Sequence, residues 1–241
     1  MIKNNISSFF NEEVLGKNFL RSKTINYIKT DGCIGHQIKI GNYWEEWMFK
    51  YIQDNYIPNT NMIDLGGNIG TTSFLMSEVL SDNCHIFTFE PIYSDILFKN
   101  VLDNNLTDKI LIYPYGIGDK IETLKIKNVC LIEQINFGAV SITNSLEDKE
   151  DSLKIDIFPL DYFNFENVSL IKIDVEHMEI EALKGSINLI KRCRPTIIIE
   201  TYQLDKLSKT DIFKELLMIG YEIEQIPEGY FDFIMKIKNK K

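Results

Sequence analysis

Apolar positions follow two periods along this chain, and their alternation predicts a layered α/β fold. Compact apolar runs of strand length occupy residues 62–65, 85–89, 110–113, 169–173 and 195–200. Between these runs, apolar residues recur at spacings of three and four, as in a helix with one buried face. Strands that alternate with helices build a parallel sheet covered on both faces. The fold class expected is therefore α/β, with a Rossmann-like and mostly parallel sheet.

The same pattern places the helices. They are predicted directly after Gly70 and over residues 94–104, 178–192 and 211–219, with one more from Asn42 to the helix-breaking Pro58. The chain ends differently, because two strand-like runs, 221–226 and 230–237, are joined by Pro227-Glu228-Gly229. A three-residue link that contains glycine predicts a hairpin. We therefore expect the parallel sheet to end in an antiparallel pair.

The domain organisation expected from this pattern is simple. Residues 1–57 are predicted to form an N-terminal extension of short strands and a helix, and residues 58–241 the main domain. An insertion around residues 117–167 interrupts the alternation. Strand-like runs inside it lie at residues 122–126 and 153–158. Its polar stretch, residues 136–151, is predicted either to cover a substrate or to form an exposed excursion, since long loops in compact domains are often functional.

The segment from Asp64 to Gly70 (Asp-Leu-Gly-Gly-Asn-Ile-Gly) joins the first of these strands to the following helix. Glycine permits backbone torsions that other residues avoid, and it lets the chain approach a ligand closely. The next helix points its free N–H groups towards such a ligand. Glu90 closes the second strand, where an acidic side chain can accept hydrogen bonds from ribose hydroxyls. This combination predicts a site for a nucleotide-like ligand.

The order of the glycines favours S-adenosylmethionine over a dinucleotide. A dinucleotide site uses Gly-x-Gly-x-x-Gly to clear space for a pyrophosphate, whereas Gly66 is followed here by Asn68 and Gly70. S-adenosylmethionine has no phosphate, and its ammonium and carboxylate suit Asp64 and the N–H groups of the turn. The terminal hairpin agrees, since Rossmann-like methyltransferases end their sheet with an antiparallel strand. A P-loop is excluded because no Gly-Lys-Ser/Thr follows.

Composition and charge limit the classes of partner that this protein is expected to bind. The formal net charge of -9 opposes phosphate backbones, so no nucleic-acid partner is expected. The basic run Lys236, Lys238, Lys240 and Lys241 is interpreted as a solvated tail. No apolar run approaches the ~20 residues of a membrane span, and the polar start lacks the layout of a signal peptide. These features predict a cytoplasmic protein without a membrane partner.

The cysteines are scattered and lack the spacing of metal ligands. They are Cys33, Cys84, Cys130 and Cys193. We therefore expect free thiols, with neither a disulfide framework nor a metal centre.

Several segments, taken together, resemble the FkbM family of S-adenosylmethionine-dependent methyltransferases. They lie between Trp44 and Glu200, about two-thirds of the chain. The segments are Ile63 to Gly70, Phe87-Thr88-Phe89-Glu90-Pro91, Gly116-Ile117-Gly118-Asp119, Leu160-Asp161, Ile171-Lys172-Ile173-Asp174-Val175-Glu176, Glu179, Leu183-Lys184-Gly185, Arg194-Pro195 and Ile199-Glu200. The first segment is common to many methyltransferases. The run Ile-Lys-Ile-Asp-Val-Glu followed by Leu-Lys-Gly is far more specific.

The resemblance implies the class I methyltransferase fold, with S-adenosyl-L-methionine as the cofactor. It implies methyl transfer to oxygen, commonly a hydroxyl of a sugar, a glycan or a related small molecule; a protein acceptor stays open. The cofactor-binding residues that it implies are Asp64, Gly66, Asn68, Gly70 and Glu90, with Tyr115 and Gly116 near the adenine. Acceptor specificity is expected in residues 1–60 and 128–160, where the resemblance is least.

Methyl transfer to a hydroxyl requires alignment of the acceptor and a base for its proton. Asp174 and Glu176 follow the fourth strand, and one of them is predicted to position or deprotonate the acceptor. His177 is predicted to assist, since an imidazole pKa of roughly 6.5 suits neutral pH. Glu200, after the fifth strand, is a further candidate. Two roles remain open for Asp174 and Glu176, namely helix capping and binding of a divalent metal.

His177 is also a departure from the family pattern, which has glycine after Asp-Val-Glu. If that glycine has a positive φ, His177 carries backbone strain and projects its ring near the reacting methyl group.

Two other functions compete with this interpretation. Tyr202 and Lys206 have the Tyr-x-x-x-Lys spacing of NAD-dependent short-chain oxidoreductases, although the glycine pattern and the hairpin oppose it. A non-catalytic binding module that keeps the cofactor fold is the other alternative.

Overall fold

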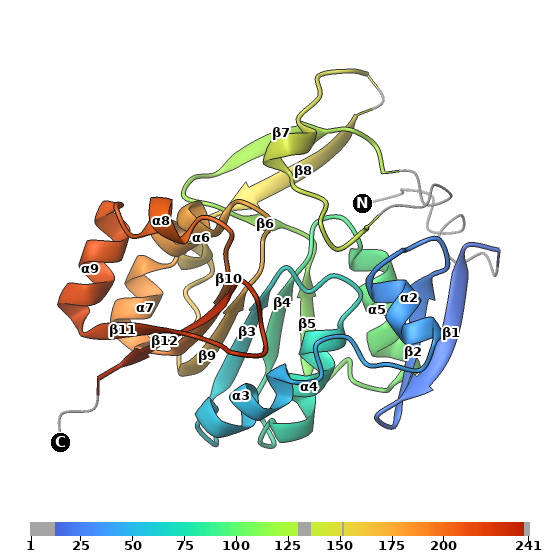
Figure 1. The fold of residues 1–241 in the computed structure, drawn as a ribbon, viewed down its shortest axis with the longest axis horizontal. Helices are drawn as coiled ribbons and strands as arrows, with labels where there is room; N and C mark the ends of the chain where they lie inside the picture. Colours follow the sequence, from blue (N-terminus) through green and yellow to red (C-terminus); the bar gives the residue numbers. More distant parts are fainter. Residues whose placement is uncertain (1–12, 130–135, 151, 239–241) are drawn as a thin grey trace.

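The computed structural model describes residues 13–129, 136–150 and 152–238, and these form a central seven-stranded sheet (Figure 1). The strand order is β11-β12-β10-β9-β3-β4-β5. Five strands run parallel: β3 (Asn61–Leu65), β4 (Ile86–Phe89), β5 (Ile110–Tyr113), β9 (Val168–Ile173) and β10 (Thr196–Glu200). The last two, β11 (Tyr221–Gln225) and β12 (Asp232–Ile237), are antiparallel. The predicted fold class, including its terminal hairpin, is confirmed.

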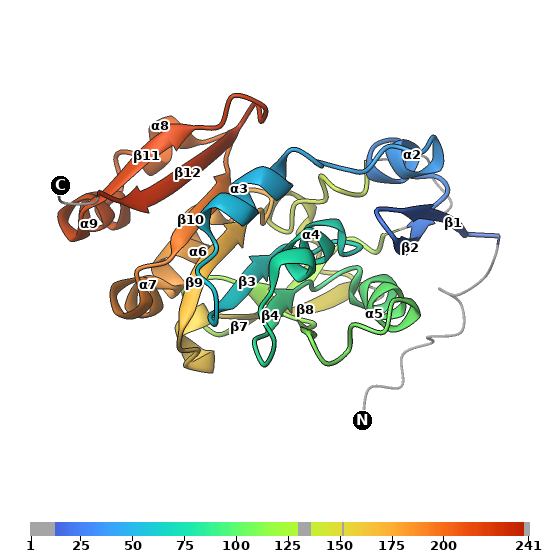
Figure 2. The ribbon, with the colours of Figure 1, turned by 90° about the horizontal axis from the view of Figure 1, so that it is seen from below.

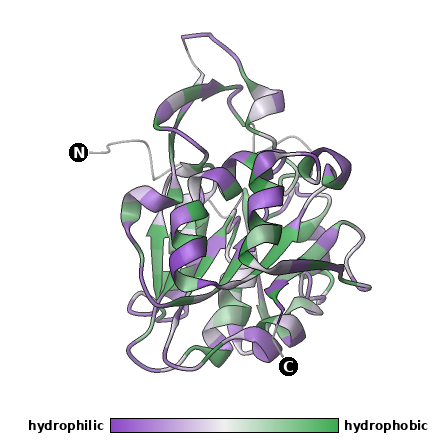
Figure 3. Ribbon diagram, turned by 90° about the vertical axis from the view of Figure 1, so that its left-hand side faces the viewer, coloured by the Kyte–Doolittle hydropathy of each residue, from purple (hydrophilic) through white to green (hydrophobic). Residues whose placement is uncertain are grey.

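Alternate residues of the central strands face different cores. Met62, Leu170 and Ile198 belong to one buried cluster, while Ile63 and Ile171 belong to the other. This period of two is what a strand buried on both faces requires. Figure 3 accordingly shows the central strands mainly in green, whereas the helices carry purple hydrophilic segments.

Helices cover both faces of the sheet (Figure 2). Apolar side chains of α3 (Met48–Asn55), α4 (Thr71–Val79) and α5 (Ser94–Asp103) fill the first cluster. Those of α6 (Glu179–Gly185), α7 (Ile187–Cys193) and α9 (Asp211–Ile219) fill the second. The chain therefore has the three-layer arrangement that places ligands at the carboxyl ends of its strands.

The prediction of a single helix over residues 178–192 is wrong, because Ser186 separates α6 from α7. The Ser186 side chain is fully buried, and its hydroxyl donates to the Ala182 carbonyl at 2.6 Å. Asp161 then accepts the backbone N–H groups of Asn188 and Leu189, at 3.0 and 2.8 Å. A carboxylate at this place caps the first turn of α7 and makes a fresh helix start favourable.

The segment before α3 contains β1 (Leu15–Leu20), β2 (Lys23–Ile28) and a short helix, α2 (Ile34–Lys39), that was not predicted. β1 and β2 form an antiparallel hairpin. α5 completes the free edge of β2 with side chains: Asn100 bonds the backbone of Asn26, and Asn104 bonds that of Thr24. The predicted helix from Asn42 begins only at Met48.

The insertion forms a separate small sheet, in the upper part of Figure 1. Its strands are β6 (Gly116–Ile117), β7 (Glu122–Ile126) and β8 (Leu153–Phe158), in the order β6-β8-β7. The two runs predicted inside the insertion are thereby confirmed. Single turns of 3₁₀ helix lie at Thr143–Ser145 and Leu160–Phe163, and α8 (Leu204–Leu207) follows β10.

Three of the four cysteines, Cys33, Cys84 and Cys193, are free thiols. Cys130, Lys240 and Lys241 lie outside the described residues, as do parts of the two regions expected to set acceptor specificity. Among the described residues, none of the helices has the length and apolar character needed to span a bilayer.

Candidate functional site

A cleft of about 210 Å³ opens where the carboxyl ends of β3, β4, β9 and β10 meet the insertion. Eight residues predicted for the site line it: Gly66, Asn68, Glu90, Tyr115, Gly116, Asp174, Glu176 and Glu200. Three others predicted for the site, Asp64, Gly70 and His177, do not line it. The structure thus brings most of the sequence-derived site together in one hollow.

The turn after β3 approaches its neighbour too closely for any side chain at Gly66. A Cβ atom there would lie 1.7 Å from the Asp174 carbonyl oxygen, and the φ of Gly66 is +87°. Asn68 and Gly70 also have positive φ, at +47° and +101°. Gly70 is the N-cap of α4, so the turn passes directly into the helix. The backbone is thereby shaped into a concave wall of the cleft.

Asp64 lies beneath this turn. Its side chain is 0% exposed, and its Oδ2 accepts the Ser73 hydroxyl at 2.6 Å. Its Oδ1 is buried and finds no hydrogen-bond partner among the described residues. Burial raises the pKa of Asp64, while Lys172 and the Ser73 hydroxyl oppose that rise. The orphaned oxygen is a group that a bound ammonium or water can satisfy.

Glu90 ties the turn to the end of β4. Its Oε2 accepts the Asn68 N–H at 2.8 Å, and its Oε1 accepts those of Ile92 and Tyr93 at 2.7 and 2.9 Å. Burial raises the pKa of Glu90 to about 7, although the three N–H groups favour the ionised form. A carboxylate oxygen accepts two hydrogen bonds, so Oε2 keeps capacity for a hydroxyl.

The residues predicted near the adenine form an apolar wall. The Tyr115 ring lies 4.9 Å from that of Phe158, centroid to centroid, and an added Cβ at Gly116 would meet Ile157 at 2.4 Å. Tyr115, Gly116, Ile92 and Ile117 all line the cleft. A flat surface of this kind suits a purine base.

Acidic side chains gather on the other side of the cleft. Lys172 is 3% exposed within β9, and its Nζ donates to Asp174 Oδ2 at 2.6 Å. Burial alone would lower the pKa of Lys172, but Asp174, Asp64 and Glu45 hold it above its ordinary value. Burial, with Asp174 and Glu200 nearby, raises the pKa of Glu176 to about 8. Asp174 is therefore an ion-pair partner, whereas Glu176 is a carboxyl whose raised pKa suits a general base.

The strain expected at His177 is confirmed, because its φ is +77° and that of Glu176 is +45°. The ring nitrogen Nδ1 lies 3.0 Å from Gln203 Nε2, and the backbone N–H donates to Glu179 Oε1 at 2.7 Å. The imidazole is thus held towards the segment after β10 and outside the residues that line the cleft.

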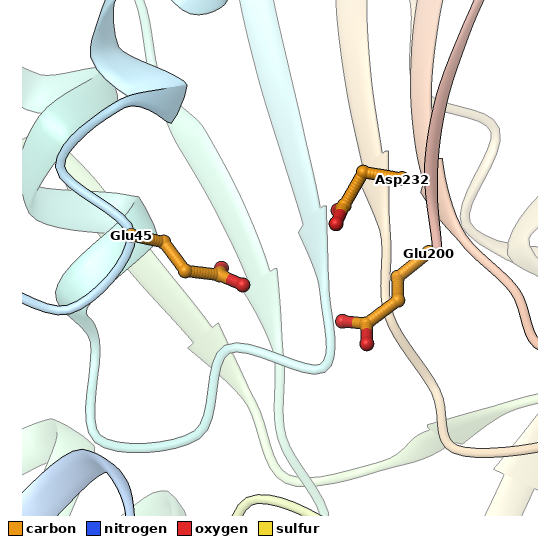
Figure 4. A group of neighbouring side chains, drawn as sticks. All are labelled: Glu45, Glu200 and Asp232. Carbon is orange, nitrogen blue, oxygen red and sulfur yellow. The ribbon is translucent and has the colours of Figure 1, made fainter. Parts of the chain in front are cut away.

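Sequence reasoning missed three charged residues of the site. Lys172 is a lysine inside an otherwise apolar buried strand, and that anomaly was a usable signal. Glu45 and Asp232 lie far apart in the sequence, and no local pattern connects them. The structure brings their carboxylates together with that of Glu200 (Figure 4).

A comparison with family models matches residues 64–226, more than half of the chain, to the methyltransferase FkbM domain. The chain belongs to the FkbM methyltransferase family. It is therefore a methyltransferase, and its cofactor is S-adenosyl-L-methionine. A search of curated proteins finds no match.

Solved structures of other methyltransferases are similar to this chain at low sequence identity. The methyltransferase FkbM from Methylobacillus flagellatus is 20% identical, with a TM-score of 0.50 over 78% of this chain. The match covers 49% of that protein, so the chain spans about half its length. The O-methyltransferase from Bacillus cereus, solved with SAH, is 15% identical, with a TM-score of 0.45, over 79% of this chain and 80% of that one.

Proposed function

We propose that this methyltransferase transfers the methyl group to a hydroxyl oxygen of a sugar, a glycan or a related small molecule. The observation that carries the proposal is Glu176, which lines the cleft and holds a pKa of about 8. A hydroxyl needs a base as it attacks, and a base whose pKa lies near the working pH is the most effective.

The cofactor end of the cleft is assigned to the turn and to Glu90. The absence of a side chain at Gly66 lets the turn pack directly against the backbone of Asp174. Glu90 Oε2, which accepts one N–H from the turn, would accept the ribose hydroxyls of the cofactor. Tyr115 and Gly116, which line the cleft, would contact the adenine. Asp64 supports the turn from below, where its Oδ1 lies buried without a hydrogen-bond partner among the described residues. Gly70 contributes as the N-cap residue of α4 and does not itself line the cleft.

The acceptor end is assigned to Asp174 and Glu176. The bound cofactor supplies an electrophilic methyl group on its sulfonium. Glu176 would take the proton of the acceptor hydroxyl as that oxygen attacks the methyl group. Asp174, anchored by Lys172, orients the hydroxyl. His177 stays outside proton transfer, because Gln203 holds its ring.

Acceptor choice is assigned to residues 1–60 and 128–160, the two regions in which specificity is expected. Cys33, Ile34 and Trp44 from the first, and Phe137 and Ile142 from the second, line the same cleft. The free thiols and the acidic charge support a cytoplasmic enzyme that acts neither on nucleic acid nor at a membrane.

The oxidoreductase alternative has no support from geometry. The Tyr202 hydroxyl donates to Glu200 at 3.0 Å, and Lys206 donates to Gln203 at 3.1 Å, so the two do not form a catalytic pair.

The test is a transfer assay with labelled cofactor against free sugars, nucleotide sugars, glycans and a protein panel. We expect label on a hydroxyl acceptor, and kcat/KM that rises with pH and levels off above about 8. Glu176→Gln should lower kcat by about 100-fold or more and leave cofactor affinity unchanged. The matched control is Glu181→Gln on α6. Label found only on protein, or full activity in Glu176→Gln, refutes the proposal.

A further inference from the structure

Three carboxylates from distant parts of the chain meet at one wall of the cleft. Glu45 lies shortly before α3, Glu200 ends β10 and Asp232 begins β12. Each offers a carboxylate oxygen, and these oxygens all lie within 4.8 Å of one another. Figure 4 shows the three carboxylates pointing into one shared space from three separate elements. Glu45 and Glu200 also line the cleft.

Lys172 lies close enough to lower the pKa of all three carboxyls, but it forms no ion pair with any of them. Within residues 13–129, 136–150 and 152–238, no Lys, Arg or His nitrogen forms an ion pair with any of the three within 4.0 Å. The nearby Lys172 bonds to Asp174 instead. Glu200 accepts one hydrogen bond, from the Tyr202 hydroxyl at 3.0 Å. Three carboxylates this close cannot all stay ionised without a further cation.

The Asp232 carboxylate gives separate evidence that this group lacks a hydrogen-bond or ion partner. The residue is 4% exposed, and its Oδ1 is buried without a hydrogen-bond partner in the described part of the chain. Buried polar atoms in folded proteins are almost always satisfied by protein, water or an ion. Since the side chain points towards Glu45 and Glu200, the partner belongs in the space that the three share.

We propose that Glu45, Glu200 and Asp232 bind one divalent cation of the Mg²⁺ or Mn²⁺ class at the acceptor end of the cleft. Three oxygen ligands without sulfur or imidazole select a hard cation. Such ions keep several water ligands, and acceptor hydroxyls can replace these on the side open to the cleft. The proposal that a cation binds here does not depend on the proposed function. The proposal that this cation holds the acceptor does rest on it. The expectation of no metal came from cysteine and histidine spacing, which does not test a carboxylate site.

Protonation competes with the cation. Burial raises the pKa of Glu45 to about 8, of Glu200 to about 7 and of Asp232 to about 6. Other charged groups that face the site are Lys172 on β9, and Asp174 and Glu176 after β9.

The experiment is a titration of the full chain, stripped with EDTA, with Mn²⁺ at pH 8.0, followed by electron paramagnetic resonance. We expect one site per chain, competition by Mg²⁺, and a rise in melting temperature that EDTA reverses. Glu45→Gln and Asp232→Asn should each weaken binding at least tenfold, with Glu224→Gln on the exposed face of the hairpin as control. Circular dichroism reports whether each variant folds, and Glu200→Gln serves as a third probe.

Two results overturn the proposal: the absence of saturable Mn²⁺ binding up to millimolar concentration, or one site whose affinity is equal in wild type and in all folded variants. Mn²⁺ binding at these three residues in a protein that methylates no hydroxyl refutes the proposed function and leaves the cation site intact.

Discussion

The side-chain amide of Asn100 pairs with both backbone groups of Asn26, as a neighbouring strand would. Oδ1 accepts the Asn26 N–H at 2.7 Å, and Nδ2 donates to its carbonyl at 3.0 Å. Asn104 repeats this arrangement one helical turn later with Thr24, at 2.8 and 2.7 Å. Four residues of helix rise about 6 Å, close to two residues of strand, so the two spacings match. Asn100 differs because Nδ2 also reaches the Ile69 carbonyl in the cofactor turn, at 2.8 Å.

Replacement of Asn100 should therefore affect both stability and cofactor binding. Asn100→Ala leaves buried groups of Asn26 and Ile69 without partners, and we expect the free energy of unfolding to fall by about 3 kcal/mol. Asn104→Ala is the control, since its site is partly exposed and does not touch the turn; we expect a loss of about 1 kcal/mol. Calorimetry should show weaker cofactor binding only in Asn100→Ala. Equal cofactor affinity in both variants would contradict the link.

Helices and strands with a strong hydrophobic period could be predicted from the sequence. Features that depend on contacts with distant segments could not. The strands at residues 122–126 and 153–158 and the helix at 211–219 were correct because local pattern determines them. The break at Ser186 was missed because Asp161, on another segment, caps the new helix.

The same distinction holds for the site. The turn from Asp64 to Gly70 and the acidic pair after β9 follow strands, and their place at the sheet edge could be inferred. Glu45 and Asp232 reach that edge only through the packing of the extension and the hairpin, which no spacing in the sequence encodes.

Alanine variants at Gly66 and Gly220 allow the cost of a steric clash to be measured separately from the cost of backbone strain. Both have positive φ, at +87° and +106°, but an added Cβ meets the Asp174 backbone at Gly66 and no atom within 4 Å at Gly220. Gly220→Ala should cost about 1–2 kcal/mol of unfolding free energy. Gly66→Ala should cost roughly 3 kcal/mol or more and abolish cofactor binding, because the turn must move away from β9. Urea denaturation compares them, and equal losses would show that contact with Asp174 is unimportant.

Two variants at His177 test the proposal that its imidazole stays outside proton transfer. In His177→Gly, relief of the φ of +77° offsets the lost contact with Gln203, so stability should change by less than about 1 kcal/mol. In His177→Ala the strain persists, and we expect a loss of roughly 1 kcal/mol. Both variants should keep kcat within about threefold, because the ring lies outside the lining of the cleft. A large loss of kcat in both variants would instead place the imidazole in the reaction.

The buried carboxyls of Glu45 and Glu176 should make the protein less stable as pH rises, when neither cofactor nor cation is bound. Burial holds the pKa values of Glu45 and Glu176 near 8, whereas the ordinary value for glutamate is 4.5. Between these values the folded state binds more protons than the unfolded state, so the stability present below pH 4.5 is progressively lost up to about pH 8. We expect the melting temperature in EDTA to fall from pH 6 to pH 8.5, and Glu45→Gln, unlike Glu224→Gln, to flatten that fall. A melting temperature that rises over this range would show that these carboxyls ionise readily in the folded protein.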